Sequence, residues 1–339
     1  MHILVTGGAG YIGSALIIEL LKNGHKVKCL DRFFFGAESL DEALPNPNLQ
    51  LIRDDIRWFD PNILRNVDVV IDLASLSNDP SGELDPVKTF DINFLGRSRV
   101  ARLSKEYGVR RYILASTCSI YGFQDCLLDE DSQINPLTTY AKASQKAEED
   151  VLPLADSKFA VTVLRFATVY GYSRRMRFDL AVNAMVLSLY KDHTINIMKD
   201  GTQWRPFIHI RDVVEAYKSV MNLPVDKING QIFNVGFDDQ NYQIFHLAEL
   251  VGKSLNLPYK IKWYGNKDNR SYRVKFKKFK ETVNFVAPHP IKDGTLEIFE
   301  ALKDGRLKES PKTNTVEWYK HIIDSHKLVS SLILGQTLL

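Results

Sequence analysis

The stretch "HILVTGGAGYIGSALIIEL", residues 2 to 20, carries the strongest indication of the fold. Its first residues form an apolar run typical of a buried strand, and its last residues repeat apolar side chains with helical spacing. Gly7, Gly10 and Gly13 stand directly between the two patterns. Three glycines alone would suit any tight turn, but between a strand and a helix they let the backbone approach a pyrophosphate, which the first helical amides can hold. The stretch therefore predicts a strand, a turn and a helix that bind a dinucleotide.

Apolar runs alternate with helical patterns through the first half of the chain. The runs are "KVKCLD" (26–31), "LQLIRDD" (49–55), "VDVVIDLAS" (67–75), "RYILAS" (111–116) and "AVTVLRFATV" (160–169), and helices are expected at 14–23, 87–107 and 140–154. Continuous Val/Ile/Leu strands that are each followed by a helix indicate a parallel sheet covered on both faces. We therefore predict a doubly wound α/β domain over residues 1–172.

The alternation weakens after residue 172. Helices are expected at 179–190, 211–221 and 242–255, and a further strand at "GQIFNVG" (230–236). We expect residues 205–240 to rejoin the first domain. Residues 173–204 and 241–330 then form a smaller, interleaved α/β domain for the substrate, followed by a C-terminal tail at 331–339.

Asp31 ends the second expected strand, eighteen residues after Gly13. A carboxylate at this position can accept hydrogen bonds from both hydroxyls of an adenosine ribose, and it would repel a 2′-phosphate. It therefore favours NAD over NADP, although the neighbouring Arg32 could soften that preference. The alternative is an ordinary turn residue at the end of a strand.

Composition excludes several classes of function. Lysine plus arginine number 44 against 41 aspartates and glutamates, and the two signs are interspersed, so no basic stripe suggests a nucleic-acid partner. Cys29, Cys118 and Cys126 have neither metal-ligand spacing nor the even number of a disulfide framework, and the histidines show no ligand spacing. The start, "MHILV", resembles no signal peptide, and "LVSSLILGQTLL" (328–339) is shorter than the roughly 20 residues that span a bilayer. These patterns predict a cytoplasmic protein without a metal or a membrane partner.

Several ordered motifs resemble a known superfamily. The glycine loop, "ASTCSIYG" (115–122), Tyr140, "RFATVYG" (165–171) and "WRPFIHIRDV" (204–213) are similar to those of the extended short-chain dehydrogenases/reductases. Within that superfamily the chain resembles the nucleotide-sugar epimerase/dehydratase family, of which UDP-glucose 4-epimerase is the familiar member. The resemblance runs to about residue 300 and includes "NVGFDDQNYQIFHLAELV" (234–251) and "DNRSYRV" (268–274). It implies a Rossmann fold, NAD as cofactor, a nucleotide-diphosphate sugar as substrate and a homodimer.

The resemblance also implies catalytic roles. Thr117 would hydrogen-bond the sugar oxygen that is oxidised, and Tyr140 would take its proton while hydride passes to the nicotinamide. A free tyrosine has a pKa of about 10, so the family relies on a lysine four residues on to stabilise the phenolate. That position is Ser144 here, while Lys142 and Lys146 point away from the tyrosine's face of the helix. Three outcomes are open: the positive nicotinamide suffices, another cation substitutes, or the protein is a catalytically impaired NAD and nucleotide-sugar binder.

Further site residues are implied by the same motifs. Family positions near the cofactor fall on Tyr11, Ile12, Arg32, Asp55, Ile56, Leu73, Ala74, Ser75 and Asn93, each of which could also be ordinary packing. Substrate positions fall on Thr168, Arg205 and Arg270, where guanidinium groups suit a diphosphate and a surface salt bridge is the alternative. The run "SRRMRFDLAVNAMV" (173–186) carries positive charge into a helix start, which suits an anionic substrate, so Arg177, Asp179 and Asn183 join the candidates.

The leading interpretation is an NAD-dependent epimerase that abstracts and returns hydride at a sugar carbon, with C4 favoured. A nucleotide-sugar dehydrogenase or 4-ketoreductase is the alternative that uses the same site. Family dehydratases follow the active-site Thr with an Asp-Glu pair that eliminates water, and here Cys118 and Ser119 replace it, which argues against a sugar 4,6-dehydratase. In a homodimer the helices at 87–107 and 140–154 would pair, with Phe90, Phe94, Ala147 and Val151 in the interface.

Overall fold

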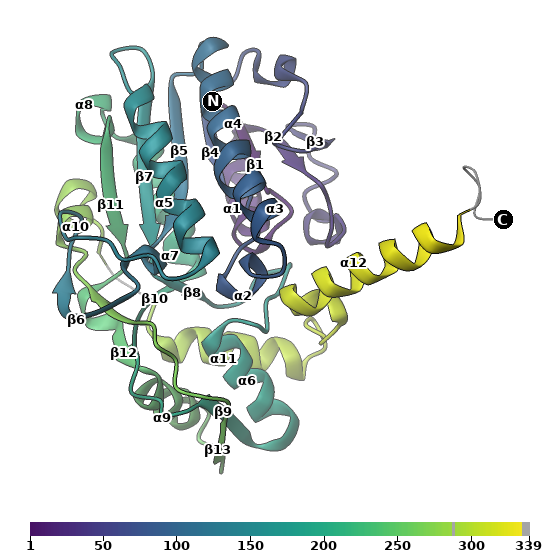
Figure 1. Cartoon of the computed structure of the whole chain (residues 1–339), viewed down its shortest axis with the longest axis vertical. Coiled ribbons are helices and arrows are strands. Elements are labelled where there is room, and N and C mark those ends of the chain that lie inside the picture. The colour runs from purple at the N-terminus through teal and green to yellow at the C-terminus, as the bar shows by residue number, and fades with distance from the viewer. Residues whose placement is uncertain (287–288, 334–339) are drawn as a thin grey trace.

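Parallel strands form the central sheet of the computed structural model, which describes residues 1–286 and 289–333 (Figure 1). From edge to edge the strands are β11 (Gln231–Val235), β7 (Ala160–Phe166), β5 (Arg111–Thr117), β4 (Val69–Asp72), β1 (His2–Thr6), β2 (Lys26–Asp31) and β3 (Leu49–Arg53). The predicted doubly wound parallel sheet is confirmed. The strand order reverses between β1 and β4, the place where such sheets bind ligands.

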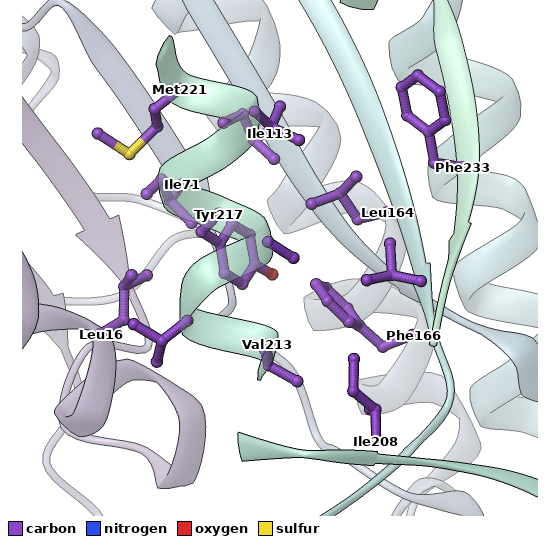
Figure 2. Close-up of a cluster of buried hydrophobic side chains, with 14 of the residues drawn as sticks. Leu16, Ile71, Ile113, Leu164, Phe166, Ile208, Val213, Tyr217, Met221 and Phe233 are labelled. Atoms are coloured by element: carbon purple, nitrogen blue, oxygen red, sulfur yellow. The ribbon is translucent and has the colours of Figure 1, made fainter. Parts of the chain in front are cut away.

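Helices cover both faces of this sheet. One face carries α1 (Tyr11–Lys22) and α7 (Ile210–Asn222), and the other carries α4 (Arg97–Glu106) and α5 (Thr139–Val151). In β1, Ile3 and Val5 enter the core under α1 and α7, whereas Leu4 enters the core under α4 and α5. Successive side chains of a strand point to opposite faces, so a continuously apolar strand must be covered on both. Figure 2 shows the first core, where Tyr217 of α7 lies among strand residues such as Ile71.

The expected helix at 87–107 is divided into three parts. They are α3 (Pro86–Phe90), a π-helical turn (Asp91–Gly96) and α4. In the wider turn, the Asn93 amide accepts a hydrogen bond from the Leu76 nitrogen at 2.8 Å and donates to the Leu76 oxygen at 3.1 Å. Periodicity alone could not predict this interruption, because the partner that stabilises it lies in the loop after β4.

The second half of the chain builds smaller sheets and a second core. The sheets are β12 (Asn241–Gln243) with β10 (Trp204–His209) and β8 (Thr168–Tyr170), β13 (Lys260–Tyr264) with β9 (Thr194–Met198), and β14 (Ser271–Val274) with β6 (Phe123–Leu128). Helices α6 (Ala181–Asp192), α9 (Ile244–Leu255) and α11 (Ile291–Lys303) pack around their own apolar cluster. The other helices are α2 (Asp79–Gly82), α8 (Val225–Ile228), α10 (Lys277–Val283) and α12 (Thr315–Leu332). Of the expected tail at 331–339, residues 334–339 lie outside the described residues.

Candidate active site

A cavity of about 580 Å³ opens at the carboxyl ends of the central strands, where the strand order reverses. Gly7 of the glycine loop, Asp31 and Tyr140 are among the residues that line it. Arg205 and Arg270, from the second half of the chain, also line it. The fold therefore brings together the expected dinucleotide, catalytic and diphosphate residues in one space.

The glycine loop leaves no room for side chains. Gly7 has a φ of +64°, and a Cβ added there would lie 2.9 Å from the Cα of Ala74. A Cβ at Gly13 would lie 2.5 Å from the Gly7 oxygen. Helix α1 starts directly after Gly10, so its first amides, which have no partner within the helix, are available at this turn. The loop fits a pyrophosphate, which needs bare backbone and amide donors.

Asp31 stands at the end of β2 beside the glycine loop. Its carboxylate accepts hydrogen bonds from the Ala9 nitrogen at 3.0 Å and the Phe33 nitrogen at 2.7 Å. Burial raises the pKa of Asp31, and these hydrogen bonds act in the opposite direction. The Arg32 guanidinium donates to Asp55 at 3.1 Å, so much of its charge is balanced away from Asp31. A ribose bound beside Asp31 would therefore face a carboxylate, because the Arg32 guanidinium is engaged by Asp55.

Most other expected cofactor residues lie in the same lining. They are Tyr11, Ile12, Arg32, Asp55, Ile56, Leu73, Ala74 and Ser75. Asn93 lies outside the lining, because its amide is engaged by the Leu76 backbone. The structure gives Asn93 a role in shaping the loop that follows β4.

Tyr140 and Thr117 lie together in the cavity. Tyr140 is held in the first turn of α5, whose N-cap Thr138 accepts a hydrogen bond from the Ala141 nitrogen at 3.2 Å. Burial raises the pKa of the Tyr140 phenol, whereas the charge of Arg97 and a hydrogen bond with the Thr117 hydroxyl lower it. The side chain is half-buried, and the ionisation of its phenol depends on these neighbours.

Ser144 lies outside the cavity lining, one helical turn after Tyr140. It is 1% exposed, and its hydroxyl donates to the Tyr140 backbone oxygen at 2.9 Å. Lys142 and Lys146 are exposed on the opposite side of α5, as expected, and Lys146 pairs with Glu149 at 2.7 Å. None of these three residues brings a positive charge to the phenol.

The expected diphosphate arginines are anchored by acids. Arg205 donates to Asp268 at 3.1 Å, and Arg270 donates to both oxygens of Asp268 at 2.8 and 2.7 Å. Arg270 also pairs with Asp79. Burial would raise the pKa of Asp268, but the hydrogen bond from Arg270 and the charge of Arg205 hold it below its usual range. Both guanidinium groups are thereby fixed in the cavity lining.

The residues from the arginine-rich run have different positions. Arg177 lines the cavity and binds Asp179 through two hydrogen bonds of 3.2 and 2.6 Å; Thr168 also lines it. Asn183 is fully buried outside the lining, because its amide donates to the Tyr11 hydroxyl at 3.2 Å and accepts from the Gly171 nitrogen at 3.1 Å. Its contacts hold the start of α6 against α1.

Sequence reasoning missed two cavity arginines, Arg97 and Arg175. Arg175 donates to the Thr315 hydroxyl at 3.0 Å and lies 3.7 Å from the ring centre of Phe35. Its Nε and Nη1 have no hydrogen-bond partner among the described residues. Burial lowers the pKa of Arg175 to about 10. For Arg175 the available signal was the arginine-rich run at 173–186. That run did not show which of its arginines would be buried without a balancing acid.

Within residues 1–286 and 289–333, no group of three His, Cys, Asp or Glu side chains could hold a metal ion. In that same part of the chain, none of the helices combines the length and the apolar character that crossing a membrane requires.

A bare glycine turn, an acid at the end of β2 and a half-buried tyrosine in one cavity at the switch point of the sheet are typical of a dinucleotide-dependent α/β enzyme. The chain belongs to the NAD dependent epimerase/dehydratase family, which matches residues 3–236. The extended short-chain dehydrogenase/reductase resemblance is confirmed, and with it NAD as the cofactor of the family. The protein is an NAD-dependent enzyme that modifies a nucleotide sugar.

Individual relatives have different activities. UDP-glucuronic acid decarboxylase 1 of Arabidopsis thaliana is 28% identical over 325 residues, which cover 91% of this chain and 71% of that protein. The uncharacterized UDP-glucose epimerase YtcB of Bacillus subtilis is 27% identical, over 87% of this chain and 95% of its own length. The solved structure of MoeE5 with UDP-glucuronic acid and NAD is 26% identical with a TM-score of 0.79, covering 90% of this chain and 100% of that one.

Proposed function

We propose that the protein is an epimerase that inverts one carbon, with C4 favoured, of a nucleotide-diphosphate sugar. The observation that carries this proposal is that Thr117 and Tyr140 line one cavity with the glycine loop, and that Arg205 and Arg270 line the same cavity. When bound, NAD accepts hydride from the sugar carbon and returns it. Residues 1–172 and 205–240 would hold the cofactor, and 173–204 with 241–330 would hold the sugar together with Thr117, Tyr140, Thr168 and Arg205 of the first domain.

The side chains divide the remaining work. Thr117 orients the reacting hydroxyl, and Tyr140 removes its proton as the carbonyl forms, then gives a proton back when the alcohol is restored. Asp31 would bind the adenosine ribose, and the α1 amides would bind the pyrophosphate. Arg205 and Arg270 would contact the sugar diphosphate, with Arg177 and Thr168 nearer the sugar.

Elimination of water is disfavoured by the two residues after Thr117. The Cys118 thiol is buried and donates to the Arg165 oxygen at 3.3 Å, and burial raises its pKa far above the usual range. Ser119 lines the cavity, but a hydroxyl is a poor acid and base near neutral pH. Decarboxylation is the second candidate, because oxidation at C4 would also start it and decarboxylases are among the relatives.

The experiment that tests the proposal is a panel of nucleotide sugars followed by NMR. Inversion at C4 without net change in NADH supports an epimerase. Accumulation of NADH with an oxidised product indicates a dehydrogenase, and loss of the carboxyl carbon from UDP-glucuronic acid indicates a decarboxylase. Absorbance of the denatured supernatant adds a second readout, because an epimerase that reuses its cofactor is expected to retain NAD through purification.

We predict that the protein binds NAD more tightly than NADP. Replacing Asp31 with Ala should weaken NAD binding by roughly 1.5 to 3 kcal/mol, the value of a hydrogen bond to a charged group. Calorimetric titration of both cofactors measures this, with Arg32→Ala as the control, since Asp55 already engages that side chain. Equal or tighter binding of NADP by the unaltered chain would contradict the assignment of Asp31.

We also predict a homodimer. Ala147 and Val151 pack in the chain's own core, so they are not available to a partner. Val87 and Leu95, between residues 87 and 107, are exposed apolar side chains, at 79% and 54%. Light scattering at micromolar concentration should give twice the chain mass, and Leu95→Glu should lower it, whereas the same change at Leu328 of α12 should not. A monomeric mass for the unaltered chain would rule the dimer out.

A further inference from the structure

We propose that Arg97, from a different helix, supplies the positive charge that stabilises the Tyr140 phenolate. The proposal rests on the proposed function, because it takes Tyr140 as the proton acceptor. Desolvation raises the pKa of the Tyr140 phenol, and a nearby cation favours its ionised form. On α5 itself the residue one turn on is Ser144, whose hydroxyl is engaged by the Tyr140 backbone oxygen at 2.9 Å.

Arg97 lies in the wall of the cavity. It is the first residue of α4, is 2% exposed, and lines the cavity together with Tyr140. Its Nη2 donates to the backbone carbonyl oxygens of Asp72 at 3.0 Å and of Ala115 at 2.5 Å. The guanidinium is therefore fixed at the carboxyl ends of β4 and β5. Its Nε has no hydrogen-bond partner among the described residues. Burying a cation that lacks a hydrogen-bonded counterion costs free energy, unless a nearby negative charge interacts with it.

The charge of Arg97 is only loosely balanced. Its nearest acid is Asp72, with Nε and Oδ2 3.8 Å apart. The Asp72 carboxylate already accepts hydrogen bonds of 2.5 Å from the Thr6 and Tyr112 hydroxyls. Arg177, the other cation near Tyr140, is instead paired with Asp179 through two hydrogen bonds.

The groups facing Tyr140 act in both directions. Burial raises the phenol's pKa and Asp79 raises it further, while Arg97, Thr117 and Arg177 lower it. Asp79 is itself held by Arg270 and by the Thr138 hydroxyl at 2.6 Å.

On the side of Arg97, the facing groups are Asp72, Tyr112 and the buried phenol of Tyr217. An exclusively structural role, in which Arg97 only neutralises Asp72, is the competing explanation.

Fluorine NMR on the full chain, saturated with NAD and labelled with fluorotyrosine, tests the proposal. The Tyr140 signal is identified as the one missing from Tyr140→Phe, and its titration midpoint is followed against pH. Arg97→Met should raise that midpoint by about one pH unit or more, since a nearby opposite charge typically accounts for shifts of this size. Arg97→Lys, which keeps the charge, should shift it much less.

The pH dependence of turnover gives a second readout. The limb that rises with pH should move to higher pH in Arg97→Met by the same amount as the NMR midpoint, because the phenol must lose its proton to act as a base. A folded Arg97→Met variant with an unchanged Tyr140 midpoint would overturn the proposal and leave only the structural role.

Removal of Arg97 alone leaves Asp72 buried, so that variant can fail to fold. Asp72→Asn/Arg97→Met removes both charges and is then compared with Asp72→Asn. The midpoint should be higher in the double variant, and equal midpoints would also overturn the proposal. Because the NMR midpoint needs no turnover, it separates failure of this inference from failure of the proposed function, which Tyr140→Phe tests.

Discussion

Tyr140→Phe is expected to lower turnover on a confirmed substrate by about a hundred- to ten-thousand-fold, the contribution typical of a general base. The phenylalanine ring keeps the packing at the start of α5 and removes only the hydroxyl. NAD affinity and thermal stability should therefore change little, so the loss would appear in kcat. Steady-state kinetics and calorimetric titration of NAD with the same protein sample measure the two effects separately.

Tyr272→Phe is the matched control, because it removes a phenol from the same cavity. The Tyr272 hydroxyl is 3.4 Å from the Ser119 hydroxyl, and burial raises its pKa to about 12. Its loss should reduce turnover far less than the loss of the Tyr140 hydroxyl. If Tyr140→Phe retains full turnover, the tyrosine is structural and another group accepts the proton.

The parts of this site that the sequence predicted are those whose determinants lie close together in the chain. Strand β1, the glycine turn and α1 follow from residues 2–20, because each glycine is required by backbone that is only a few residues away or by the next strand in the sheet. The position of Asp31 follows from the length of one helix and one strand. Both depend on helices and strands whose extent can be predicted from the periodicity of apolar side chains along the sequence.

Arg97 could not be predicted in the same way. Its guanidinium binds the ends of β4 and β5, so its role exists only once α4 has packed on the sheet. In the sequence it stands in "GRSRVARLSKE" as one of four basic residues, and nothing in that pattern distinguishes it from the other three. The π-helical turn that precedes it has the same kind of origin, since Asn93 is engaged by Leu76 from another segment.

For Asn183 the sequence predicted a substrate residue, but the structure places it outside the cavity lining. Its position at a helix start after three arginines favoured a contact with substrate, but its amide is used by Tyr11 and Gly171. A polar side chain that connects two helices and one that binds a ligand give the same local pattern. Only the long-range contact separates them.

Arg165→Met is expected to lower the free energy of unfolding by about 3 to 5 kcal/mol, because it leaves Glu148 buried without its cation. Arg165 of β7 binds Glu148 of α5 through Nη2 at 2.7 Å and through Nε at 3.1 Å to each oxygen. The two side chains are 5% and 4% exposed. Ser116 also donates to Glu148, and Arg165 donates to the Tyr121 hydroxyl at 3.1 Å, so the pair is fully hydrogen-bonded.

Urea unfolding of a small set of variants tests this. Lys146→Met is the control on the same helix, since its pair with Glu149 is about half exposed and should contribute at most about 1 kcal/mol. Arg165→Met/Glu148→Leu should recover much of the lost stability, because replacing both partners leaves no buried charge without its counterion. Glu148 stands two turns after Tyr140 on α5, so the pair holds this helix against the sheet. Arg165→Met should therefore also lower turnover under conditions in which the variant is still folded. A stability loss no larger than that of Lys146→Met would show that the pair does not anchor α5.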